Sequence, residues 1–125
     1  MKVHVKLRQI AMPGGEEKIL ADTRGLLNGE RLLYPEDTGI MHTVTFGAEE
    51  IILERKADVN SRTELRKRGG KGKSIVVSEY GSLEFETELY RYEKDDGFCL
   101  AGYRVLSSGD TVLDQILIWE ITPVS

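Results

Sequence analysis

The chain has 125 residues, a formal net charge of −4 and a hydrophobic fraction of 40%. This length corresponds to one domain, residues 1–125, which is large enough to bury a core without a disulfide or a structural metal. The acidic balance argues against a generally basic nucleic-acid surface, and no apolar run is long enough to cross a bilayer. The single cysteine, Cys99, cannot form an internal disulfide, and the first ten residues alternate in polarity, unlike a signal peptide. We therefore expect a cytoplasmic protein.

Apolar and polar residues alternate with a period of two along most of the chain, which is typical of half-buried β-strands. Asn28-Gly29 lies between two apolar pairs and predicts a two-residue hairpin, since both residue types tolerate positive φ. Residues 57–63 are the weakest strand assignment and fit an irregular corner equally well. The other predicted strands, in chain order, cover residues 3–10, 18–27, 31–34, 40–46, 50–56, 63–68, 73–80, 82–93, 98–106 and 111–121.

These strands are joined by only a few residues each, which favours antiparallel neighbours because a parallel pair needs a crossover of about a dozen residues or more. A meander of about ten strands must curl into a closed barrel or into two packed sheets. The sequence therefore predicts an all-β, antiparallel fold, and alternation alone leaves these two architectures open.

Three glutamates at alternate positions, Glu84, Glu86 and Glu88, lie opposite an apolar face that includes Phe85. Like charges at this spacing need water or cationic partners. Six lysines and arginines concentrate in residues 62–73, so we expect the glutamates to face solvent and to pair with cations of that hairpin. A metal site is disfavoured, because hard cations are held by oxygens that converge from loops.

One segment, "ILERKADVNSRTELRKRGGKGKSIVVSEYGSLEFETELYRYE", combines an arginine-ended apolar strand, a small corner, a basic strand and a tyrosine-glycine corner that opens a long strand. In this combination it resembles the central signature of the YwiB-like bacterial proteins, a family of unknown function. Weaker similarity extends to both ends of the chain. The matching positions are Arg55, Leu65, Tyr80, Gly81 and Leu83.

The resemblance implies a closed, calycin-like (lipocalin-like) barrel of about eight to ten strands, and it brings no established activity or catalytic residues. The sequence departs from the family pattern at two points. Family members often show a glycine two residues after the arginine, where this chain has Ala57 followed by Asp58, and Glu79 stands where a proline is frequent before the tyrosine.

Four side chains are candidates for a ligand site in such a barrel. Arg55 shares a strand face with Ile51, so its guanidinium points inward if that face is the interior, either as a structural ion pair or as an anchor for a ligand's carboxylate or phosphate. Tyr103 and Trp119 lie on the apolar faces of the last two strands, as core residues or as cavity walls. Tyr80 either holds the strand corner through its hydroxyl or contacts a ligand near one end.

Other chemistry has little support in the sequence. Cys99 is expected to be an inert core thiol, and nothing in the spacing of His4 and His42 indicates a catalytic triad or a metal site. The glycine-rich run at 69–72 lacks phosphate-loop spacing and joins two strands instead of a strand and a helix. We expect no catalytic residues, no metal and no cofactor.

Two functions stay open. The first is a non-catalytic binding module that holds a small apolar or amphipathic molecule inside the barrel, at Arg55, Tyr80, Tyr103 and Trp119. The alternative is an interaction protein that binds a protein or RNA through the basic hairpin 62–73, chiefly through Arg66, Lys67 and Arg68. Nucleic acid is the weaker partner, since residues 54–73 contain no aromatic side chain for base stacking. An enzyme is the least supported class, and the sequence does not give the oligomeric state.

Overall fold

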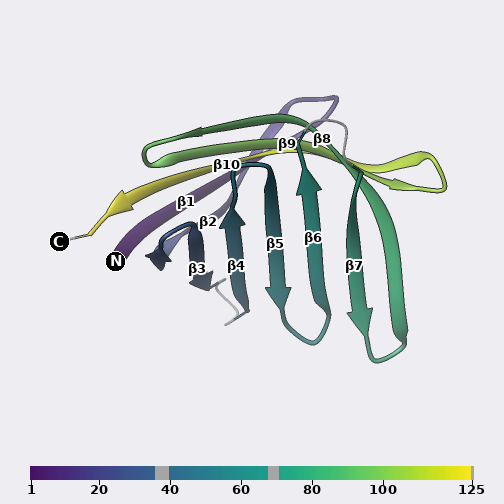
Figure 1. The fold of residues 1–125 in the computed structure, drawn as a ribbon, viewed down its shortest axis with the longest axis horizontal. Helices are drawn as coiled ribbons and strands as arrows, with labels where there is room; N and C mark the ends of the chain where they lie inside the picture. The colour runs from purple at the N-terminus through teal and green to yellow at the C-terminus, as the bar shows by residue number, and fades with distance from the viewer. Residues whose placement is uncertain (36–39, 68–70, 125) are drawn as a thin grey trace.

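The chain folds into a closed antiparallel barrel in a computed structural model, which describes residues 1–35, 40–67 and 71–124 (Figure 1). Neighbours around the barrel follow the order β1-β10-β9-β8-β7-β6-β5-β4-β3-β2. The described residues include no helix that could span a membrane. The ten strands are β1 (Lys2–Ala11), β2 (Glu16–Asn28), β3 (Arg31–Pro35), β4 (Met41–Phe46), β5 (Glu50–Lys56), β6 (Asn60–Arg66), β7 (Gly72–Ser78), β8 (Gly81–Asp95), β9 (Phe98–Ser107) and β10 (Asp110–Pro123).

The predicted all-β meander is confirmed, with two local differences. The hairpin between β2 and β3 turns at Gly29-Glu30, one residue later than predicted, with Gly29 at φ 63°. This register places Leu27 opposite Leu32, whereas a turn at Asn28-Gly29 would set Leu27 against Glu30. The irregular corner is confined to residues 57–59, where the Ala57 N–H donates to Asn60 Oδ1 (3.1 Å), and β6 begins directly afterwards.

Alternate residues of every strand point into the barrel and fill its middle. The largest side chains with less than 2% exposure come from six strands, so the core is shared around the barrel and is not confined to one side. They are Val3, Val5, Leu32, Ile51, Leu65, Thr87 and Trp119. Because the side-chain period of a strand is two, this inward set also fixes which residues face solvent.

A β-bulge at Tyr90 reverses this alternation in the second half of β8. Leu89 pairs with Tyr103, but Arg91 pairs with Gly102, so Tyr90 is the extra residue. As a result Tyr92 and Lys94 point inward: the Tyr92 hydroxyl donates to Gly47 O (2.8 Å) and Lys94 Nζ donates to Phe46 O (2.9 Å). Uninterrupted alternation from Phe85 would have placed both side chains outside.

The three alternating glutamates of β8 face solvent, as predicted. Lys71 of the basic hairpin lies 3.7 Å from Glu86, which confirms one expected partner. Glu88 is instead approached by Arg104 of β9, at 3.9 Å, and Arg62 pairs with Glu54 of β5 at 3.2 Å. The cations of residues 62–73 therefore form ion pairs with carboxylates on both strands that flank the hairpin, β5 and β8.

Gly72 is required by a close approach between β6 and β8. Thr87 Oγ1 donates to Glu64 O (2.7 Å), and a Cβ on Gly72 would lie 2.0 Å from that same carbonyl oxygen. We predict that Gly72→Ala lowers the free energy of unfolding by about 1–3 kcal/mol, the usual cost of overpacking. Urea unfolding followed by circular dichroism measures the change. Gly14→Ala is the matched control, because its Cβ meets only Glu16 Oε1 at 3.9 Å; equal losses in both variants would contradict this account.

Candidate functional site

The interior of the barrel is divided by an edge-to-face contact between Phe46 and Trp119, whose ring centroids lie 5.3 Å apart. A cavity opens on either side of this pair, and Trp119 lines one while Phe46 lines the other. The Arg55 cavity, about 240 Å³, is lined chiefly by Tyr34, His42, Arg55, Thr63, Tyr103, Gln115 and Trp119. The Lys94 cavity, about 380 Å³, is lined chiefly by Val3, Leu27, Glu30, Phe46, Lys94, Asp96, Cys99 and Ile121.

A row of cross-strand neighbours forms one side of the Arg55 cavity. Tyr34 of β3 pairs with His42 of β4, His42 with Arg55 of β5, and Arg55 with Ser61 of β6. The Tyr34 and His42 rings stack at 5.1 Å with an interplanar angle of 8°. Tyr34, His42 and Arg55 are each engaged in further contacts within the protein. The row places one guanidinium beside an aromatic stack at the edge of the cavity.

Buried polar groups form the opposite side of the Arg55 cavity. Gln115 Nε2 donates to the Tyr103 hydroxyl (2.6 Å), and Gln9 Nε2 donates to Gln115 Oε1. Tyr103 and Gln115 are both buried. Burial raises the pKa of Tyr103, while the bond from Gln115 opposes this shift. The phenol therefore stays protonated and keeps a hydroxyl proton to donate.

Trp119 forms the apolar floor of the Arg55 cavity. It is 1% exposed, and its Nε1–H lies 3.5 Å from the Tyr34 hydroxyl. That long bond satisfies the one polar atom of the indole, so the rest of the ring offers apolar contact area. A second polar pair, Thr63 Oγ1 and Ser74 Oγ at 2.9 Å, lies on the β6–β7 side.

Three of the four predicted ligand residues, Arg55, Tyr103 and Trp119, come together in this cavity. Tyr80 lies apart: it is 92% exposed in the β7–β8 turn and lines neither cavity. The corner is held by Ser78, whose Oγ accepts from the Tyr80 N–H (3.2 Å) and donates to Gly81 O (3.5 Å). The expected hydroxyl-to-backbone role of Tyr80 is therefore filled by the serine.

Sequence reasoning missed two lining residues whose signal was available. His42 alternates with Val44 and Phe46, and Gln115 alternates with Leu117, so period two places both side chains on the inward face. Polar residues on an otherwise apolar face are the informative exceptions in such a pattern.

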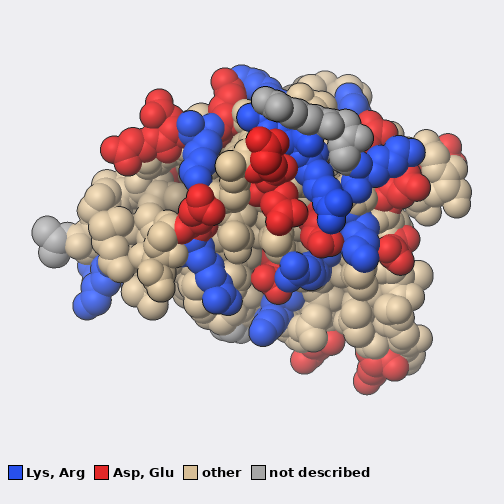
Figure 2. Space-filling view, in the orientation of Figure 1, with Lys and Arg blue, Asp and Glu red and all other residues tan. Residues whose placement is uncertain are grey.

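The described residues of the basic hairpin, 62–67 and 71–73, show interleaved charges and not a continuous cationic surface. Figure 2 shows lysine and arginine side chains alternating with carboxylates over the face of β4 to β7. Arg66 and Lys67 are exposed, and Lys67 Nζ lies 5.9 Å from the centre of the Tyr92 ring. Arg68, the third predicted contact, lies outside the described residues.

Within residues 1–35, 40–67 and 71–124, no group of three His, Cys, Asp or Glu side chains is placed to hold a metal ion. His42 and Ser61 both line the Arg55 cavity, but β5 separates their strands. Two inter-strand spacings set the backbones about 10 Å apart, with Arg55 between them, whereas a catalytic pair needs direct hydrogen-bond contact. The placement of His42 and Ser61 in this cavity is therefore unsuited to nucleophilic catalysis by this pair.

Comparison with known proteins supports the fold. The YwiB protein of Bacillus subtilis has a crystal structure that matches 98% of this chain and 92% of its own, with a TM-score of 0.64 and 12% sequence identity. No protein-family model matches the sequence, and no curated protein matches it. At this identity the likeness concerns the architecture alone: the chain has a YwiB-like fold, a closed ten-stranded antiparallel barrel that is consistent with the expected calycin-like architecture.

Cys99 provides a test of the interior environment. Burial raises the pKa of its thiol from 9.0 to about 11, and the nearby Lys94 charge opposes the shift. Because the thiolate is the reactive form, we predict that iodoacetamide alkylation of the folded protein accelerates up to about pH 11, whereas the denatured chain levels off near pH 9. Mass spectrometry of timed reactions measures both profiles.

The raised pKa of Cys99 also makes the free energy of unfolding depend on pH. The folded protein retains a proton between pH 9 and 11 that the unfolded chain loses, so Cys99 contributes stability that declines as pH rises through this window. Cys99→Ala should flatten that part of the stability profile. A folded-state alkylation midpoint at or below pH 9 would show that the thiol is not in the buried environment described.

Proposed function

We propose that this chain is a non-catalytic, calycin-like member of the YwiB-like group that binds a small amphipathic anion in the Arg55 cavity. The observation that carries the proposal is the meeting of one guanidinium, an aromatic stack and buried hydrogen-bonding groups around one space inside the barrel. The likeness to the YwiB protein of Bacillus subtilis supports the group assignment through fold only.

The volume of the cavity limits the ligand. About 240 Å³ equals the liquid volume of roughly eight water molecules at about 30 Å³ each. It lies below the range of about 300–1,000 Å³ typical of drug-sized ligands. The proposed ligand is therefore a small molecule with one ring or a short chain, and a long-chain lipid is too large.

The charged group of the ligand is indicated by Arg55. A guanidinium has five N–H donors in a planar fork that matches a carboxylate or phosphate, and a ligand would share these donors with the contacts that Arg55 already makes within the protein. Glu54, also at the cavity, already pairs with Arg62 on the outer side. Arg55 is therefore the proposed recognition group for the charged end of the ligand.

The uncharged part of the ligand is indicated by the opposite wall. Trp119, Leu53 and Leu117 offer apolar surface, and the Tyr103 hydroxyl offers one polar contact held in place by Gln115. An aromatic or short aliphatic body fits this wall, with a hydroxyl or carbonyl oxygen as an optional acceptor for Tyr103. Pockets with mainly apolar walls and a few fixed polar groups are the usual form of small-molecule sites.

We predict that phenylacetate changes the fluorescence of Trp119, the single tryptophan of the chain, while the uncharged analogue phenethyl alcohol binds more weakly. Arg55→Gln should weaken phenylacetate binding about tenfold or more, as expected for a hydrogen-bonded charged group worth about 1.5–3 kcal/mol. Fluorescence titration and calorimetry measure the dissociation constants.

Arg91→Gln is the matched control, because Arg91 pairs with Glu93 on β8 and neither residue lines either cavity. It should leave phenylacetate binding unchanged. A panel of small carboxylates and phosphates that produces neither heat nor a change in Trp119 fluorescence would refute the proposal. Equal weakening by both arginine variants would indicate a nonspecific charge effect and would also refute it.

The alternative proposal is a protein or RNA partner at the basic hairpin 62–73. Exposed Arg66 and Lys67 favour it, while the pairing of Arg62 and Lys71 with carboxylates reduces the net field there. We predict that reversal of Arg66, Lys67 and Arg68 to glutamate abolishes pull-down of such a partner without lowering the melting temperature. Retention of the partner by the reversed variant would exclude this surface.

A further inference from the structure

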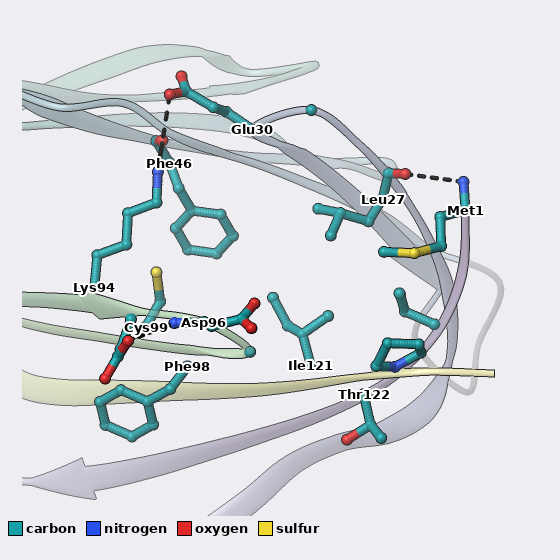
Figure 3. Close-up of a pocket in the computed structure, with 15 residues that line it drawn as sticks. Met1, Leu27, Glu30, Phe46, Lys94, Asp96, Phe98, Cys99, Ile121 and Thr122 are labelled. Atoms are coloured by element: carbon teal, nitrogen blue, oxygen red, sulfur yellow. Dashed lines mark hydrogen bonds and ion pairs between the residues drawn. The ribbon is translucent and has the colours of Figure 1, made fainter.

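The Lys94 cavity lies at the opposite end of the barrel from the Arg55 cavity and has its own lining. Figure 3 shows Phe46 and Ile121 facing its interior, with Leu27 on the far side. Its volume of about 380 Å³ exceeds that of the Arg55 cavity and falls within the usual range for small-molecule sites. Val3 and Cys99 at its base are buried.

Lys94 is already engaged within the protein. The bulge at Tyr90 turns its side chain inward, where Nζ donates to Phe46 O (2.9 Å) and lies 3.8 Å from Glu30 Oε1. These contacts hold the ammonium against one wall, as the dashed lines in Figure 3 show. The single lysine of the lining is therefore occupied with a carbonyl and a carboxylate.

Carboxylates outnumber cationic side chains around this cavity. Glu30, Asp95 and Asp96 line it together with Lys94 and Met1, whose N-terminal ammonium donates to Leu27 O (3.0 Å), so these charged groups carry a formal charge of about −1. Asp95 Oδ1 accepts the backbone N–H of Asp96 (2.8 Å) and thereby fixes the turn. In Figure 3 the Asp96 carboxylate points from the β8–β9 turn toward the side chain of Ile121.

We propose that the Lys94 cavity is a second binding site, specific for a small amphipathic amine. The ammonium group contacts Asp96 and Glu30 at the mouth, and an apolar chain lies against Phe46, Leu27 and Ile121. An anion of the same size is disfavoured, because it would meet three carboxylates and only two cationic groups, Lys94 and the Met1 ammonium, each of which already donates to a backbone carbonyl. This site is formed by different residues from the proposed Arg55 site, so each proposal can be tested without the other.

The chain contains a reporter for this site. Cys99 lines the Lys94 cavity and Trp119 lines the Arg55 cavity, so thiol protection and indole fluorescence each report on one end. We expect n-hexylamine to slow the reaction of Cys99 with dithiodipyridine at pH 8.5. Hexan-1-ol should protect more weakly, and hexanoate should protect least.

Two variants of opposite sign test the charge preference. Asp96→Asn should weaken hexylamine binding about three- to fivefold, the range for a partly exposed ion pair, and Lys94→Gln should strengthen it by a similar factor. Glu79→Gln, in the β7–β8 turn at the other end of the barrel, is the matched control and should change nothing. Calorimetry supplies the dissociation constants, and melting curves confirm that each variant is folded.

The outcomes are separable from those of the Arg55 site. Protection of Cys99 by hexylamine, with opposite shifts in the two variants, supports the second site whatever phenylacetate does. Absence of protection, stronger protection by hexanoate, or an Asp96→Asn variant that binds hexylamine as tightly as the unaltered chain would overturn it, even if Trp119 responds fully to phenylacetate.

Discussion

The edge-to-face contact between Phe46 and Trp119 determines what this barrel can hold. The two rings meet at 5.3 Å in the middle of the interior, and both side chains are almost completely buried. In an eight-stranded barrel the interior is just narrow enough for side chains to fill it. A ten-stranded barrel is wider, so large rings are needed to close the centre of this one. With the centre closed by these rings, the remaining space is left at the two ends.

Five strands, β1, β2, β4, β9 and β10, contribute to both ends because inward residues recur at every second position. β4 supplies His42 to the Arg55 cavity and Phe46 to the Lys94 cavity, while Val44 between them is buried in the core. β10 likewise supplies Gln115 to one end and Ile121 to the other. The chemical difference between the two cavities therefore depends on the position of a residue along its strand.

Period-two alternation predicted the strands, the solvent-facing glutamates and the interior positions of Arg55, Tyr103 and Trp119. It could not predict the inward turn of Lys94, because one extra residue at Tyr90 inverts the pattern and a bulge leaves little trace in composition. The partners of Glu88 and the meeting of the Tyr103 hydroxyl with Gln115 depend on cross-strand register, which short-range patterns do not specify. Local alternation thus determines the face, and long-range pairing determines the neighbour.

The contact between Phe46 and Trp119 also bears on whether binding in one cavity would change binding in the other. Coupling between distant sites requires an element with two discrete arrangements that both ligands bias. Phe46 and Trp119 are held instead by a single close-packed set of contacts, and the Trp119 Nε1–H is directed to Tyr34. Rotating either ring would break these contacts in an interior packed as densely as an organic crystal. If both proposed sites bind their ligands, the packing of Phe46 and Trp119 between them favours independent binding at the two ends.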